Sequence, residues 1–138
     1  MDKFKQDIFY QETGKSFPHL DVLDIGAREK VIKDLYNFLG IDKVKKGLFQ
    51  DVSSILLIKD FESEKLDSAA IFDEFDFDST NSSLIIWDEN EIDRMKTSSI
   101  LEYWEFIWYG ISDDAIMLYQ EENQKILILT HFGRVYYN

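Results

Sequence analysis

Apolar residues recur at helical spacing between Ala27 and Leu39. They fall at positions i, i+1, i+4, i+7 and i+8: Val31, Ile32, Leu35, Phe38 and Leu39. With charged residues between them, this spacing predicts a long amphipathic helix. Asp24 is placed to accept backbone N–H groups at its start, and Gly40 supplies the left-handed residue that ends it.

A shorter helix is predicted from Lys3 to Glu12, with Phe4 and Ile8 on one face, before a loop around Gly14 and Pro18.

Two strands are predicted in the middle of the chain. Ser53 to Lys59 is rich in aliphatic and β-branched residues, which favours a buried strand. A second strand is expected from Ala69 to Asp78. Its alternation sends two groups to opposite faces: Ile71, Phe75 and Phe77 on one, Phe72, Glu74, Asp76 and Asp78 on the other. Residues 79–83 form a turn by composition, and residues 84–87 a return strand.

The last third of the chain predicts further strands. The segment from Asn90 to Tyr109 carries both helical spacing and β-favouring residues, and we interpret it as a short helix followed by a strand. Residues 115–119 and 125–131 are strands joined by a hairpin loop, and residues 134–137 extend the sheet.

Together these elements predict an α+β fold in a single domain, residues 1–138. An antiparallel sheet that ends in a C-terminal meander is packed by one long amphipathic helix and one or two shorter helices. No internal repeat or linker is apparent.

Length and composition bound the class of protein. The chain has 138 residues, 45% of them hydrophobic, which is ordinary for one globular domain. It contains no cysteine, which fits a reducing, cytoplasmic compartment. The first residues lack the apolar run of a signal peptide, and no run is long enough to span a membrane. We therefore expect a soluble, cytoplasmic protein.

The net charge of −12 is concentrated in one stretch. Residues 1–59 hold ten Lys/Arg and nine Asp/Glu, whereas residues 60–93 hold twelve acids and the single base Lys65. Charges this dense sum to a local field that steers basic partners and repels nucleic acid and anionic membranes.

These acids predict a binding surface. On the expected strand and after its turn they would form a ridge that meets lysines and arginines of a partner: Glu74, Asp76, Asp78, Asp88, Glu89, Glu91 and Asp93. Asp73, from the same stretch, is also counted among the expected partner-binding residues. The alternative is a solvated edge strand whose charges prevent aggregation. That explanation needs two or three charges, whereas this stretch has twelve.

Aromatic residues are concentrated between Tyr103 and Tyr109. Core packing is the simpler interpretation, but one strand face would leave Trp104 partly exposed beside Glu102 and Glu105. Aromatic anchors rimmed by carboxylates are typical of binding hot spots. Trp104 is therefore added to the expected partner-binding residues.

Catalysis and metal binding are less well supported. His131 ends an apolar strand, where a hydrogen-bonded structural histidine is the simpler interpretation than a general base. An EF-hand frame forced from Asp78 to Glu89 lacks the glycine at its sixth position and two carboxylates. Alternate carboxylates of a strand lie about 6.7 Å apart, too far to hold one ion alone. We expect no catalytic residue, no metal and no cofactor.

The end of the chain carries a resemblance. The run Tyr109-Gly110-Ile111-Ser112-Asp113-Asp114, followed by residues 127–137, Leu-Ile-Leu-Thr-His-Phe-Gly-Arg-Val-Tyr-Tyr, is similar to the ends of several small bacterial proteins. The short, acidic, cysteine-free chain resembles the immunity proteins that bacteria make beside polymorphic or contact-dependent growth-inhibition toxins.

That resemblance implies a non-enzymatic inhibitor that binds a cognate toxin domain in the cytoplasm. Such toxins are often basic nucleases, which would explain the acidic stretch, with no direct contact to nucleic acid or membrane. The alternatives are another acidic interaction module, such as an adaptor, a regulatory subunit or a nucleic-acid mimic, and a metal-dependent enzyme. The partner's identity, its activity and the oligomeric state stay open.

Overall fold

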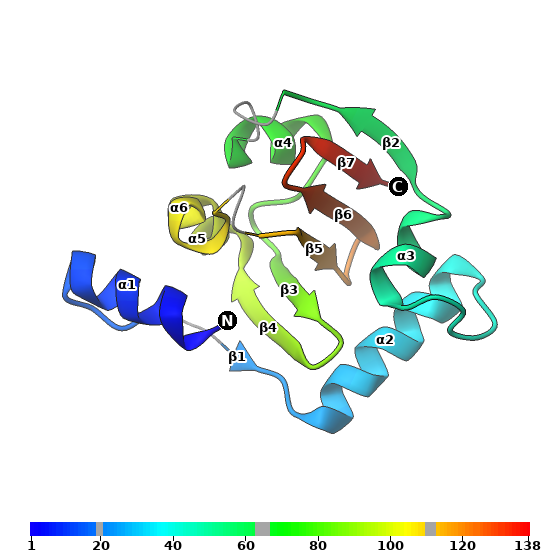
Figure 1. Ribbon diagram of the computed structural model, residues 1–138, viewed down its shortest axis with the longest axis horizontal. Helices are drawn as coiled ribbons and strands as arrows, with labels where there is room; N and C mark the ends of the chain where they lie inside the picture. Colours follow the sequence, from blue (N-terminus) through cyan, green and yellow to red (C-terminus); the bar gives the residue numbers. More distant parts are fainter. Residues whose placement is uncertain (19–20, 63–66, 110–112) are drawn as a thin grey trace.

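A computed structural model describes residues 1–18, 21–62, 67–109 and 113–138, and shows an α+β fold (Figure 1). Its helices are α1 (Lys3–Thr13), α2 (Ile25–Leu39), α3 (Leu48–Ser53), α4 (Ser68–Glu74), α5 (Thr97–Glu102) and α6 (Trp104–Ile107). Its strands are β1 (Asp21–Val22), β2 (Leu57–Asp60), β3 (Ser82–Asp88), β4 (Glu91–Lys96), β5 (Ala115–Gln120), β6 (Lys125–Thr130) and β7 (Arg134–Tyr137).

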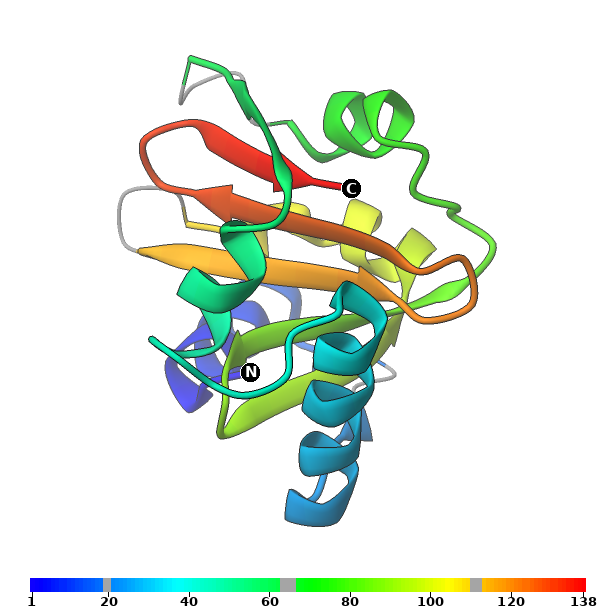
Figure 2. The ribbon, with the colours of Figure 1, turned by 90° about the vertical axis from the view of Figure 1, so that its right-hand side faces the viewer.

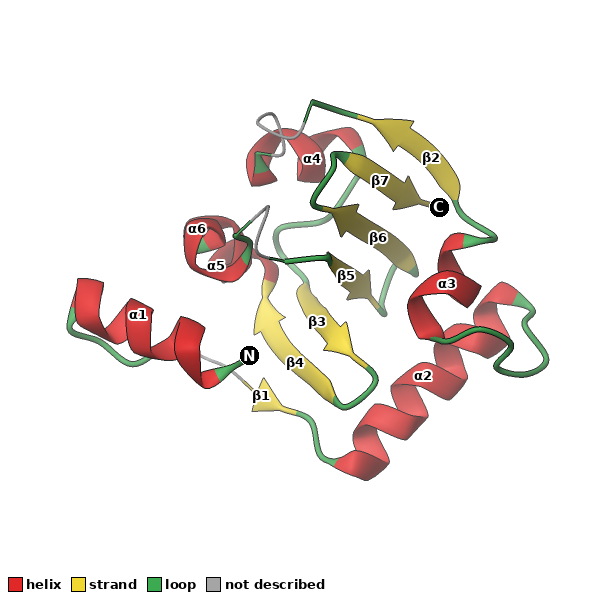
Figure 3. Ribbon diagram, viewed as in Figure 1, coloured by secondary structure: helices red, strands yellow, loops and turns green. Residues whose placement is uncertain are grey.

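Within those ranges the strands form one antiparallel sheet in the order β1-β4-β3-β5-β6-β7-β2 (Figure 3). The predicted C-terminal meander is confirmed, because β5, β6 and β7 pair in sequence. The short β1 and β2 lie at the two edges.

Both faces of the sheet are covered. Helices α2 and α3 lie in front of it in Figure 2, and α5 and α6 lie behind. Successive residues of β3 alternate between two cores: Leu84 and Ile86 pack on the α2–α3 side, and Ile85 packs on the α4–α6 side. Because each side chain of such a strand is buried, the central strands are continuous apolar runs rather than alternating ones.

Helix α2 confirms the helix predicted between Ala27 and Leu39. The Asp24 carboxylate accepts a hydrogen bond from the Ala27 N–H at 2.8 Å, and Gly40 ends the helix with a φ of 72°. Val31 and Leu35 are buried, whereas Phe38 is exposed.

Helix α1 confirms the predicted N-terminal helix but presents a different face to the protein. Phe4 is exposed, and the buried residues are Lys5 and Phe9. The prediction that Phe4 and Ile8 form the apolar face was therefore wrong for Phe4. The Phe9 ring instead packs against the rings of Tyr103 and Phe106.

The buried strand expected from Ser53 to Lys59 was wrong. Helix α3 extends to Ser53, and the strand β2 begins only at Leu57. All four residues of β2 are exposed, because this strand lies at the sheet edge and pairs with β7 alone.

The order expected between Asn90 and Tyr109 was also wrong, because the strand comes first. Residues 91–96 form β4, which pairs with β3, and the helices α5 and α6 follow.

The Thr97 hydroxyl, buried where β4 becomes α5, lies 2.6 Å from the Ser83 hydroxyl and accepts a hydrogen bond from the Gln120 amide. This network joins the start of α5 to strands β3 and β5.

Candidate functional site

The segment from residue 69 to 78, expected to be a strand, instead lies in the helix α4 (Ser68–Glu74) and a tight turn. Ile71, Phe72 and Phe75 are buried at positions i, i+1 and i+4, which is helical spacing. Asp76 has a left-handed backbone with a φ of 56°, a conformation that commonly ends helices. The chain turns there, and Phe77 returns to the core, where its N–H donates to the Phe72 carbonyl.

The predicted row of carboxylates on one strand face therefore does not exist, but several of these acids are still exposed. Asp73 and Asp76 lie at the surface and form no hydrogen bond or ion pair with the described residues. Glu74 is ion-paired with Lys59 of β2.

Asp78 stabilises the turn that leads into β3. Its carboxylate accepts hydrogen bonds from the hydroxyl and the backbone N–H of Thr80, at 2.7 and 2.8 Å, and these bonds lower the pKa of Asp78 below its ordinary value. The Gln120 side chain bonds both the N–H and the carbonyl of Asp78. This acid is exposed, but its position is fixed by the fold.

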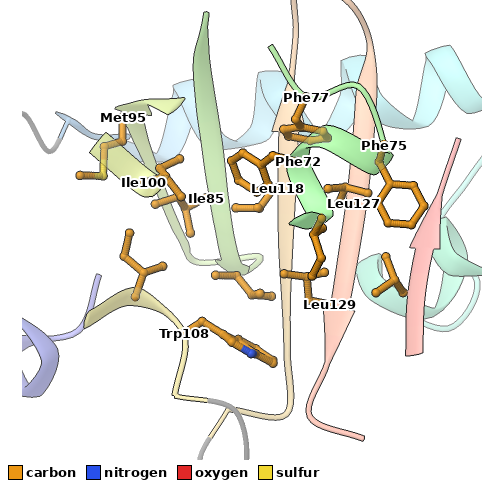
Figure 4. Packing of buried hydrophobic residues seen from close by; sticks show 14 residues of the cluster. Phe72, Phe75, Phe77, Ile85, Met95, Ile100, Trp108, Leu118, Leu127 and Leu129 are labelled. Carbon is orange, nitrogen blue, oxygen red and sulfur yellow. The ribbon is translucent and has the colours of Figure 1, made fainter. Parts of the chain in front are cut away.

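An aromatic layer lies directly beneath these acids. The Phe72 ring centroid is 5.2 Å from that of Phe77 and 6.2 Å from that of Trp104, so α4 and α6 touch. In Figure 4, Phe72, Phe75 and Phe77 point toward Leu118 and Leu127 of the sheet. The acids thus lie above a packed aromatic layer.

Trp104 is half-buried against this layer, and its ring lies 6.4 Å from that of Trp108, which is buried. The flanking Glu102 and Glu105 are exposed. We define the α4–α6 acidic surface by the tryptophan and the exposed acids of α4, α6 and the segments that adjoin them, leaving out the ion-paired Glu74: Asp73, Asp76, Asp78, Glu102, Glu105 and Trp104.

The remaining predicted acids lie elsewhere, around the β3–β4 turn. Strand β3 spans about 20 Å from Ser82 to Asp88, given the rise of an extended chain, so Asp78, before the strand, and Asp88, at its end, lie at opposite ends of it. Asp88 accepts the N–H of Asn90 at 2.6 Å, and Glu89 accepts the N–H of Leu48, at the start of α3, at 3.2 Å. The single ridge predicted from the sequence is therefore two separate groups.

Asp93 is fully buried and cannot lie on a binding surface, so its assignment as a partner-binding residue was wrong. Its carboxylate is ion-paired with the Met1 amino group and accepts a hydrogen bond from the Trp87 indole N–H at 2.9 Å. Glu91, which is half-buried, contacts the same amino group at 2.8 Å.

A buried lysine, which the sequence interpretation did not single out, contacts the ring of Trp87, the same side chain that donates to Asp93. The Lys5 ammonium donates to the Asp113 carboxylate at 2.8 Å and to the Ile107 carbonyl at 2.5 Å. It also lies 4.4 Å from the centre of the Trp87 ring and 4.8 Å from that of Tyr109. This cage attaches α1 to the body of the protein.

The described residues contain no group of three or more His, Asp or Glu side chains that could hold a metal ion. His131 is exposed, with its Nδ1 atom 3.2 Å from the Asp114 carbonyl, in line with the structural interpretation. His19 falls outside the described ranges. Among the helices described, none is both long and apolar enough to cross a membrane.

Comparisons with known proteins found no match to a family model, to a curated protein or to a solved structure.

Proposed function

We propose that this chain is a non-enzymatic immunity protein that binds a cognate, basic toxin domain, a nuclease, in the bacterial cytoplasm. The observation that carries the proposal is the pair Asp73 and Asp76. Both carboxylates are exposed and lack partners among the described residues, and both stand on the packed aromatic layer of α4. They are available to a positively charged partner without breaking an internal ion pair.

The electrostatics of the chain support this choice of partner. Residues 60–93 carry a net charge of −11, and a basic domain approaching them is attracted before contact. Complementary charge of this kind raises the association rate and sets the orientation of docking more than it adds affinity.

Packing supports the same surface. Trp104 is half-buried, packs against Phe72 of α4 and is flanked in the sequence by the exposed Glu102 and Glu105, so a partner could complete its burial. Tryptophan ringed by polar groups is the composition enriched in binding hot spots. Glu89, Glu91 and Asp93 serve contacts within the fold, and Asp88 lies at the far end of β3, so we exclude these four acids from the proposed surface.

The proposal is tested by coexpression with a basic toxin domain encoded beside the gene for this chain. The wild-type chain should restore growth and bind the purified domain. An Asp73→Lys/Asp76→Lys variant, folded by circular dichroism, should lose most of that protection. A Glu29→Lys/Asp42→Lys variant makes the same charge change on and after α2 and should still protect.

Failure of the wild-type chain to bind the toxin domain would contradict the proposal. Binding to many unrelated DNA-binding proteins, in competition with DNA, would favour a nucleic-acid mimic instead. Equal loss of protection in both variants would place the contact outside the α4–α6 acidic surface.

A further inference from the structure

A groove of about 690 Å³ opens on the opposite side of the sheet, between α3 and the edge formed by β2 and β7. Leu56, Ile58 and Tyr136 supply its apolar wall, and Lys45 and Lys46 stand at its rim. Its volume is within the range of sites that hold small ligands or peptide side chains.

The loop that carries the two lysines is held in place by the buried carboxylate of Asp51. This carboxylate accepts the backbone N–H groups of Lys45 and Lys46 at 3.0 Å each and the Tyr36 hydroxyl at 2.8 Å. These bonds, the one from Lys45 first, lower the pKa of Asp51 below its ordinary value. The loop is thereby fixed without using either ammonium group.

The two lysine side chains are exposed, and neither forms an ion pair within the described part of the chain. In a protein of net charge −12, they place positive charge at the rim of one groove. The charge of this groove is complementary to a carboxylate-bearing ligand, opposite to that of the α4–α6 acidic surface.

The groove meets an outer edge of the sheet at Ile58, where no strand other than β7 among the described residues pairs with β2. Strand β2 is the outermost strand, and the Phe61 N–H donates to the Gly133 carbonyl in register with the β2–β7 ladder. In an antiparallel pair, every second residue bonds to the partner strand. Leu57 and Lys59 therefore face β7, as Phe61 does, and the N–H and C=O groups of Ile58 and Asp60 point away from β7. The Ile58 side chain, 53% exposed, also lines the groove.

The hydroxyl groups of the groove favour a peptide over a phosphate. Ser53 donates to the Gln50 carbonyl and Ser54 to the Asp51 carbonyl, at 3.2 and 2.7 Å, so both protons are used within α3. An extended peptide instead bonds the free main-chain groups of β2 and needs no hydroxyl donor.

We propose that β2 and this groove bind an extended acidic segment of a partner protein, which adds to the sheet as a further strand. Its main chain pairs with Ile58 and Asp60, an apolar side chain covers Ile58, and its carboxylates pair with Lys45 and Lys46. The inference is independent of the proposed toxin binding, which uses the other side of the sheet.

The test is an NMR titration of the full chain with the capped peptide Glu-Ser-Val-Ser-Glu-Ser, whose Glu and Val side chains lie on one face of an extended strand and so meet the groove together. The amide signals of Ile58 and Asp60 should shift saturably and become protected from exchange. Those of Leu57 and Lys59 already face β7 and should gain less protection. The same peptide with Lys in place of each Glu, the Lys-Val peptide, is the control for charge and should bind at least about tenfold more weakly.

Two variants separate the parts of the site. Ile58→Pro removes an outward N–H that the β2–β7 ladder does not use, so it should abolish binding while the fold persists. Lys45→Glu/Lys46→Glu should weaken binding by about tenfold or more, whereas Lys15→Glu/Lys33→Glu, with the same change of net charge, should not. Unmoved Ile58 and Asp60 signals at millimolar peptide, or equal binding of the Lys-Val peptide, would overturn the proposal.

Discussion

Charged residues of the same type have opposite roles in this protein, depending on burial. Lys5 is enclosed by two aromatic rings and the Asp113 carboxylate, whereas Lys3, two positions earlier on α1, is 90% exposed beside Asp7. Charge removed from water must be compensated by partners, while exposed charge is compensated by solvent. The two lysines therefore make a matched pair for experiment.

Replacement of Lys5 by alanine should lower the free energy of unfolding by about 3 kcal/mol, because it leaves the partly buried Asp113 carboxylate without its cation and removes a packed side chain. Lys3→Ala should change it by less than about 0.5 kcal/mol. Urea unfolding measures both. Equal effects of the two substitutions would show that the Lys5 cage does not anchor α1.

Asp51 predicts a dependence of stability on pH. Because its pKa is lowered in the folded state, its ionised form stabilises the fold above the ordinary value of 3.8, and this stabilisation is lost as the pH falls through the lower folded-state pKa. The difference in unfolding free energy between the wild type and Asp51→Asn should be constant above about pH 5 and shrink in more acidic solution.

The control for Asp51 is Asp42→Asn, which alters an exposed carboxylate between α2 and α3. Its difference from the wild type should stay small across the same range. A pH-independent difference for Asp51→Asn would mean that its carboxylate is not ionised within this network.

At the scale of elements, local sequence signals decide some helices and strands, and packing between distant parts of the chain decides others. Helix α2 and the β5–β6 hairpin could be predicted, because caps, turn residues and continuous apolar runs are local signals. Helix α4 also carried a local signal, the spacing of Ile71, Phe72 and Phe75, but the alternation of acids with phenylalanine from Phe75 onward favoured a strand. Both patterns were present, and packing of α4 against Trp104 and the sheet decides between them.

The order of elements between Asn90 and Tyr109 could not be predicted locally. Strand β4 exists because it pairs with β3 and β1. The burial of Asp93 is likewise long-range, since its partner Met1 lies 92 positions away. Acidic composition indicated a surface, but it could not distinguish the exposed Asp73 and Asp76 from this buried carboxylate.

Substitutions at Asp76 test whether α4 ends in a left-handed turn. Valine resists a positive φ, so Asp76→Val should be less stable than Asp76→Gly by about 1 to 2 kcal/mol in thermal or urea unfolding. If this segment were an extended strand, valine would be the more stable choice.

Phe77→Ala, as a check that the turn returns the chain to the core, should lower the free energy of unfolding by about 3 to 4 kcal/mol.

At the scale of the whole molecule, the sheet separates the proposed acidic surface from a groove that carries two exposed lysines. The α4–α6 acidic surface lies on one side, and the groove with Lys45 and Lys46 lies on the other. A net charge of −12 therefore conceals an uneven distribution. This arrangement would allow the protein to bind a basic domain on one side while an acidic segment occupies the other.

The central claim is that Asp73 and Asp76 steer a basic toxin domain onto α4. The most direct test measures, by stopped flow, the association rate constant of the chain with that domain from low to high salt. The account predicts a steep fall with salt for the wild type and for Glu29→Gln/Asp42→Asn, and a slower, less salt-dependent association for Asp73→Asn/Asp76→Asn. Identical rates and salt dependence for the wild type and both double variants would contradict it.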